Sequence, residues 1–163
     1  MSIDLSTWEL QTCVKKGDGV LSIPSDKLLQ GYTSEYFFYN PESSVTFICP
    51  SNGATTKNSK YPRTELRERR PNKEWALKGQ HSLDANCRVT KLAGGKGVII
   101  GQIHGTDSKL TPQLVKIFWR SDNTIMVECR SDKNPNEHVQ HSFGKYALGE
   151  QISYLISVDG RTL

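Results

Sequence analysis

The sequence predicts an all-β protein with the architecture of a β-sandwich or jelly roll. Runs of β-branched and aromatic residues recur along its 163 residues and are separated by clusters of Gly, Pro, Asn, Asp and Ser, as expected for short strands joined by turns. Only residues 25–30 are expected to form a helix, so no helices are available to cover a parallel sheet. One sheet of such a sandwich can curve, and its concave face would then form a groove.

The same pattern predicts which strands pair. Each expected hairpin has two β-rich runs on either side of a turn sequence, such as Asn40-Pro-Glu-Ser43 or Ser121-Asp-Asn123. A further strand ends at the turn signal Asp159-Gly160. The expected hairpins are 36–39 with 45–49, 82–92 with 98–103, and 114–120 with 124–129, and the further strand is 152–158.

Length and charge limit the functional classes. A chain of 163 residues has the size of one domain, which we expect to span residues 1–163. No apolar run approaches the roughly 18 residues of a membrane span, so no membrane partner is expected. The net charge is +4, and residues 57–73 alone hold seven Lys and Arg against two Glu, a local excess of five positive charges. Such a patch attracts polyanions, which include nucleic acids and acidic polysaccharides.

The four cysteines give little guidance. They are widely spaced and form no C-x-x-C pair, which argues against a zinc site. Three disulfide connectivities are compatible with four cysteines, and so are buried free thiols. The positions are Cys13, Cys49, Cys87 and Cys129.

Two short motifs carry polar side chains at every second position. In Arg63-Thr-Glu-Leu-Arg67, the first, third and fifth residues would share one face of a strand. In Gln102-Ile-His104, the amide and the imidazole would likewise share a face. Each motif alone has an ordinary explanation, namely a solvated face with ion pairs or a structural histidine. Together they offer the groups needed to hold a carboxylate and to move a proton beside it.

These two motifs, in this order, resemble those of the alginate lyases of polysaccharide lyase family 7. Tyr61-Pro62 before the first motif, Gly101 and Gly105 around the second, and the opening segments 4–10 and 31–38 add to the resemblance, which spans most of the chain. It implies a jelly roll with a concave sheet as the substrate groove, and β-elimination on the acidic polysaccharide alginate. It implies no cofactor or metal, because arginine and amide groups can neutralise the substrate carboxylate.

The chemistry of this elimination assigns a role to each candidate. Arg63 is expected to hold the substrate carboxylate, since its planar guanidinium matches a carboxylate. Gln102 is expected to donate a further hydrogen bond, and His104 to remove the proton from C5 of the sugar. The expected substrate-binding residues are Glu65, Arg67 and Lys116.

A proton donor for the leaving O4 is the remaining requirement. In the family that the motifs resemble, this role belongs to a tyrosine in a C-terminal strand motif, Tyr-x-Lys-Ala-Gly-x-Tyr-x-Gln, which does not occur in these 163 residues. We therefore expect the C-terminal strands of the jelly roll to be missing and a complementary C-terminal segment, as a partner, to carry the tyrosine. The role is not transferred to Tyr146 or Tyr154, whose sequence context differs.

Several functions remain open at this stage. The leading one is an endolytic alginate lyase, and the isoleucine of Gln102-Ile-His104 leans within the family toward guluronate-containing blocks. The alternatives are a non-catalytic module that binds acidic polysaccharide, and a lyase of the same fold acting on another polyuronate. No recognisable nucleic-acid module is present, so no nucleic-acid partner is expected. The resemblance implies a secreted or periplasmic location, although the first residues lack the pattern of a signal peptide.

Overall fold

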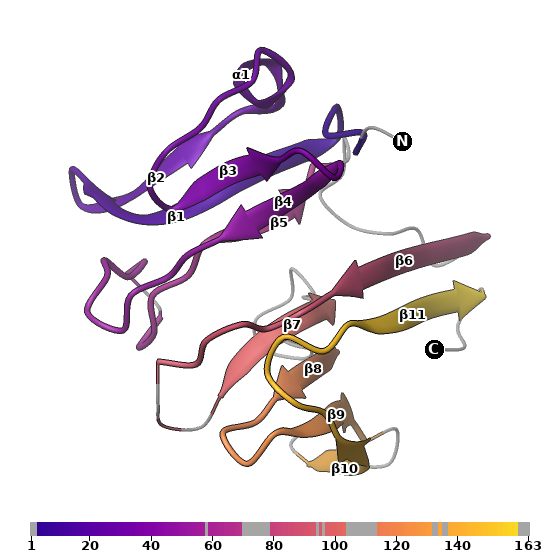
Figure 1. The fold of residues 1–163 in the computed structure, drawn as a ribbon. Helices are drawn as coiled ribbons and strands as arrows, with labels where there is room; N and C mark the ends of the chain where they lie inside the picture. The colour runs from indigo at the N-terminus through magenta and orange to yellow at the C-terminus, as the bar shows by residue number, and fades with distance from the viewer. Residues whose placement is uncertain are drawn as a thin grey trace. The chain divides into compact units, whose positions relative to one another are not determined.

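Where the structure describes the chain, it consists of antiparallel strands and one short helix, which confirms the all-β prediction (Figure 1). The computed structural model describes residues 3–57, 59–69, 79–93, 95, 97–103, 114–131, 134 and 137–159. They fall into two compact units, residues 1–73 and 74–163, and each unit is described here by itself. The single domain over residues 1–163 stays a prediction. No helix in the described ranges has the length and hydropathy to cross a membrane.

The first unit contains a three-stranded sheet and a separate hairpin. The sheet has the order β2-β1-β5, and the hairpin pairs β3 with β4, as predicted for residues 36–49. The helix α1 follows Pro24, which occupies the N-cap position in an extended conformation (φ −71°, ψ 162°). The bounds are β1 (Trp8–Lys16), β2 (Gly19–Ile23), α1 (Ser25–Leu29), β3 (Phe37–Asn40), β4 (Ser44–Phe47) and β5 (Glu65–Glu68).

One face of this sheet is apolar. Leu10 of β1 and Leu28 of α1 are buried together in a cluster with Phe37, and Leu66 of β5 packs against it. Because side chains alternate along a strand, the residues on either side of Leu66 point to the opposite face. These are Glu65 and Arg67, so the packing of a single, partly buried leucine fixes the direction of the polar motif.

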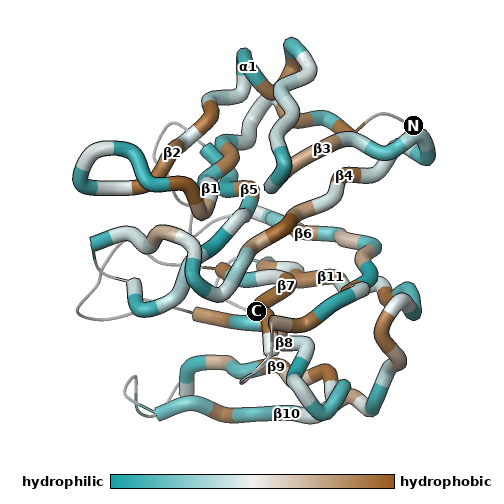
Figure 2. Tube along the Cα trace, turned by 60° about the vertical axis from the view of Figure 1, so that its left-hand side comes forward, coloured by the Kyte–Doolittle hydropathy of each residue, from teal (hydrophilic) through white to brown (hydrophobic). Residues whose placement is uncertain are grey.

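The second unit contains a four-stranded sheet, in the order β10-β9-β8-β7, and a two-stranded sheet of β11 with β6. The predicted hairpin of residues 114–129 is confirmed as β8 with β9, and the predicted strand 152–158 as β11. All residues of β10 are exposed, and this strand is largely hydrophilic in Figure 2. The bounds are β6 (Gln80–Cys87), β7 (Val98–Ile103), β8 (Val115–Trp119), β9 (Thr124–Arg130), β10 (His138–Lys145) and β11 (Ile152–Asp159).

The predicted hairpin of residues 82–92 with 98–103 is wrong. Strand β6 pairs with β11 along its whole length, from Gln80 opposite Asp159 to Cys87 opposite Ile152, and β7 pairs with β8. Strand β6 ends at Cys87, so ten residues (88–97) separate it from β7. A tight hairpin has a loop of about two to five residues, so this connection is too long for one. Strand β6 is then available for a distant partner.

The core of the second unit takes up one face of the four-stranded sheet and leaves the other face for polar side chains. Val115, Ile117 and Trp119 of β8 are buried with Ile152 and Ile156 of β11. Lys116 alternates with these buried residues, so it points to the other face of the sheet.

Candidate active site

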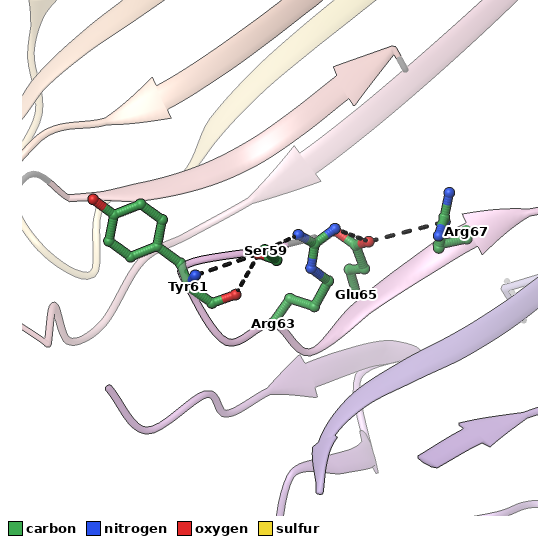
Figure 3. Close-up of polar contacts among 5 residues, drawn as sticks. All are labelled: Ser59, Tyr61, Arg63, Glu65 and Arg67. Carbon is green, nitrogen blue, oxygen red and sulfur yellow. Dashed lines mark hydrogen bonds and ion pairs between the residues drawn. The ribbon is translucent and has the colours of Figure 1, made fainter. Parts of the chain in front are cut away.

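The first polar group of the candidate site lies at the start of β5. The arginine motif was predicted as a strand over residues 63–67, but β5 begins at Glu65, and Arg63 lies in the segment just before it. The side chains of Arg63, Glu65 and Arg67 nevertheless meet, as predicted from their spacing (Figure 3). We call these three residues, together with Ser59, the arginine cluster.

Hydrogen bonds hold the Arg63 guanidinium in place. Its Nη1 lies 3.3 Å from Oε1 of Glu65, and its Nη2 donates to Oγ of Ser59 at 2.8 Å. The Ser59 hydroxyl donates in turn to the carbonyl oxygen of Tyr61 at 2.8 Å, which closes a tight loop before β5. The Arg63 side chain is 30% exposed, so it is fixed on one side and accessible on the other.

The arginine cluster carries an excess of positive charge. Nε of Arg67 lies 4.0 Å from the same Oε1 of Glu65, so one carboxylate faces two guanidinium groups. Two positive charges against one negative charge leave a net charge of +1. Its contacts with described residues use two of the five N–H donors of Arg63, which leaves others for a carboxylate ligand.

Gln11 lies beside this cluster and was missed in the sequence analysis. It is directly opposite Glu65 in the β1–β5 pairing and therefore on the same face. It is 9% exposed, and its Oε1 has no hydrogen-bond partner within the described residues. In the sequence, only its position two residues after Glu9 places Gln11 on the same strand face as a charged residue. Its partner Glu65 lies more than 50 residues further along the chain, so the pairing is not visible in the sequence.

The second polar group is a row of side chains across the four-stranded sheet. Gln102 of β7 lies opposite Lys116 of β8, Lys116 lies opposite Glu128 of β9, and Glu128 lies opposite Gln140 of β10. Directly opposite residues share a face, so these four side chains project to the same side. We call them the polar row.

Glu128 is the central acceptor of the polar row. Its Oε1 lies 2.8 Å from Nδ1 of His138 and 3.5 Å from Nζ of Lys116, and its Oε2 accepts a hydrogen bond from Nε2 of Gln140 at 3.0 Å. Burial opposes the charged form of Glu128, but the hydrogen bonds from Gln140 and His138 and the charge of Lys116 outweigh it and lower the pKa of this carboxyl. Glu128 was missed by the sequence analysis, and His138, which begins β10, was not assigned to the site there.

The remaining predicted residues stand as follows. Gln102 and Lys116 are neighbours, as described, whereas His104 lies outside the described residues and its position on the face of Gln102 stays a prediction. The arginine cluster and the polar row belong to different units. No group of three or more His, Cys, Asp and Glu side chains among the described positions could hold a metal ion.

Two tyrosines of the second unit pack against its core. The Tyr154 hydroxyl donates to the carbonyl oxygen of Ile100 at 2.6 Å, and burial raises the pKa of Tyr154 to about 12. The Tyr146 ring lies 6.4 Å from that of Trp119, in the core. Both contacts are structural ones within this unit.

Comparison with known proteins decides the family. A sequence profile described as alginate lyase matches residues 3–163. The chain belongs to the alginate lyase family. Among solved structures, this lyase chain matches alginate lyase A1-II', described as a member of polysaccharide lyase family 7, with 32% identity and a TM-score of 0.83 over 97% of this chain and 71% of that one. A comparison with curated proteins gave no match.

Other alginate lyases extend the comparison. The alginate lyase PA1167 from Pseudomonas aeruginosa is 30% identical, with a TM-score of 0.81 over 97% of this chain and 74% of that one. The alginate lyase from Corynebacterium sp. is 23% identical with a TM-score of 0.71 over 98% of this chain and 70% of that one, which supports the fold alone. These matches confirm the predicted jelly-roll fold and the family of polysaccharide lyases.

Proposed function

We propose that this chain is an alginate lyase that cleaves the polymer endolytically by β-elimination, with a lean toward guluronate-containing blocks. The arginine cluster is the observation that carries the proposal, because it offers a fixed, partly exposed guanidinium with a net positive charge around it. The family membership supports the substrate class, and the isoleucine in Gln102-Ile-His104 supports the block preference. Family members are usually extracellular or periplasmic, and we propose a secreted or periplasmic location for this chain as well.

The proposed reaction removes a weakly acidic proton. C5 of a uronate lies beside the carboxylate, so negative charge develops on that carboxylate as the proton leaves. Arg63 and Gln102 would neutralise this charge, and a well-placed donor of this kind contributes about 3–4 kcal/mol in comparable sites. His104 would take the C5 proton, the C5–H electron pair would form the C4=C5 double bond, and the C4–O4 bond would break.

The departing O4 needs a proton, which we propose comes from a tyrosine on a complementary C-terminal segment. Support comes from alginate lyase A1-II', which has been crystallised with a product written GGG as a tyrosine-to-phenylalanine variant. A variant that also replaces a histidine by asparagine is in complex with a substrate written GGMG. Substitution of a histidine and a tyrosine in those complexes agrees with one base and one acid in the reaction proposed here.

The first test is the ultraviolet absorbance of the C4=C5 unsaturated product. We would incubate the chain with guluronate-rich alginate, mannuronate-rich alginate and polyglucuronate, with His104→Ala as the inactive variant. Lys91→Ala, which removes one positive charge at an exposed position after β6, is the control. Rising absorbance that His104→Ala alone abolishes supports the proposal, and an early fall in viscosity supports endolytic cleavage.

Two other outcomes would favour the alternatives. A folded chain that binds alginate without forming product would favour the non-catalytic binding module, which the positive arginine cluster would also serve. Product from polyglucuronate but not from alginate would favour a lyase for another polyuronate.

A further inference from the structure

Glu128 has an unusual number of polar contacts that the proposed reaction leaves unexplained. Its side chain is only 15% exposed, and three side chains from two neighbouring strands contact it: Gln140 and His138 by hydrogen bonds, and Lys116 as an ion pair. A carboxylate removed from water needs such partners to remain charged. The contacts therefore keep a negative charge at the centre of the polar row.

Lys116 is the neighbour that this charge constrains. A lysine on a sheet surface is ordinarily mobile, but this one is 16% exposed, and its Nζ lies 3.5 Å from Glu128 and 5.9 Å from the centre of the Phe118 ring. Its ammonium group has three donors, and the ion pair with Glu128 faces one side of it. Within the described part of the chain, no hydrogen bond is recorded from its other side, where an anion could bind.

The register places this ammonium group next to the predicted catalytic amide. Lys116 lies directly opposite Gln102, one strand further along the sheet, and neighbouring strands are about 4.8 Å apart. A polymer held with one carboxylate at Gln102 and extended across the strands would bring another carboxylate toward Lys116.

We propose that Glu128 is a positioning residue that, through Lys116, builds a subsite for a second uronate carboxylate beside the one that Gln102 serves. This inference rests on the proposed function, since it needs a polyuronate bound across this face of the sheet. Glu128 itself repels the polymer, so its contribution is geometric: it holds the ammonium group in one orientation before the substrate arrives, which reduces the ordering cost of binding.

The test is a double-mutant cycle with Glu128→Gln, Lys116→Ala and both changes together. The full chain is assayed for kcat and KM with alginate, and for the Kd of alginate oligosaccharides by calorimetry. We expect Glu128→Gln to raise KM and Kd about fivefold, as for the loss of one charge-assisted hydrogen bond, with kcat little changed. In the Lys116→Ala background the same change should have no further effect.

The opposite results would overturn the subsite. Removal of a negative charge alone would lower KM for a polyanion and would do so equally with or without Lys116. An additive effect, or an unchanged or lowered KM, therefore contradicts the inference while leaving the lyase activity established. Glu150→Gln is the matched control, because it also converts a hydrogen-bonded carboxylate to an amide, in the turn between β10 and β11.

Two further arms keep the test decisive. If Glu128→Gln fails to fold by circular dichroism, Gln140→Ala replaces it, since that change removes one donor to Glu128 from an exposed strand. If wild-type chain forms no product but binds, the proposed lyase activity of this chain fails and the Kd cycle still decides the subsite. A folded chain that neither cleaves nor binds alginate overturns both.

Discussion

Arg63 illustrates how a single side chain can depend on shape as well as on charge. Its guanidinium is anchored by Ser59 and Glu65, and the remaining N–H donors of the same planar group can bind the substrate carboxylate. We expect Arg63→Lys to keep the positive charge but to lower kcat/KM by roughly 10²–10³-fold, because an ammonium group lacks the bidentate fork. Initial rates of product formation with alginate would measure this.

Arg67→Lys is the matched control for that substitution. Arg67 belongs to the same cluster, but its contact with Glu65 is longer, at 4.0 Å, and its expected role is to bind a neighbouring carboxylate. The change should therefore raise KM and leave kcat nearly unchanged. Equal losses of kcat from both substitutions would contradict the assignment of the carboxylate clamp to Arg63.

Cys49 provides a pH-dependent prediction at a single residue. Burial, and then the neighbouring Cys13, raise the pKa of the Cys49 thiol to about 11. A raised pKa keeps the group protonated, and the thiolate is the form that reacts, so at neutral pH Cys49 should hold at least a hundredfold less thiolate than a cysteine of ordinary pKa, about 8.5.

Alkylation with iodoacetamide, followed by mass spectrometry of the peptides, would measure this reactivity. We expect slow labelling of Cys49 in the folded chain at neutral pH, a marked increase as the pH is raised toward 11, and rapid labelling in urea. Labelling of the folded chain at the rate seen in urea would show that the thiol is not protected.

At this scale the sequence predicted what depends on local spacing. The every-second-residue pattern correctly indicated that Arg63, Glu65 and Arg67 would meet, although the strand starts later than expected. Gln11 and Glu128 escaped notice because their significance comes from residues on other strands. Cross-strand register is a property of the folded sheet, and a single sequence does not display it.

At the scale of an element, β7 depends on a glycine behind the predicted catalytic amide. A Cβ added to Gly101 would lie 2.5 Å from the Tyr154 hydroxyl oxygen, and that hydroxyl is itself fixed by its bond to Ile100. We expect Gly101→Ala to destabilise the protein by about 1–3 kcal/mol, because the tyrosine ring must move. Urea unfolding would measure the change.

Gly19→Ala is the matched control for Gly101→Ala. Gly19 is the first residue of β2, and a Cβ added there would meet nothing nearer than an oxygen 3.9 Å away. This change should alter the free energy of unfolding by much less than Gly101→Ala. Equal stability of the two variants would contradict the close approach of Tyr154.

The pairing of elements shows the limit of sequence patterns. Hairpins with short turns were predicted correctly because the turn residues lie between the strands that they join. The wrong hairpin assigned β6 to its neighbour in sequence, whereas its partner β11 begins 65 residues after β6 ends. Alternation along β6 indicates a half-buried strand, but it contains no information about which strand lies beside it.

At the scale of the whole molecule, composition predicts the fold class without knowledge of strand register. The abundance of β-branched runs and turn residues, with one short helix, was sufficient for the all-β class, and the family match over residues 3–163 covers both units. Charge is also a property of the whole chain. The net charge is +4, and residues 57–73, which contain the arginine cluster, hold an excess of five positive charges.

This distribution predicts that binding of alginate depends on salt. Dissolved ions screen charges beyond a Debye length, which is about 10 Å at 0.1 M and about 3 Å at 1 M ionic strength. The affinity for alginate oligosaccharides should therefore fall as sodium chloride is raised across this range, and it should fall less steeply for Arg67→Ala, which has one positive charge fewer. Calorimetric titrations of the folded chain at several salt concentrations would measure the slope. An affinity that does not change with salt would mean that hydroxyl contacts, and not the positive patch, hold the polymer.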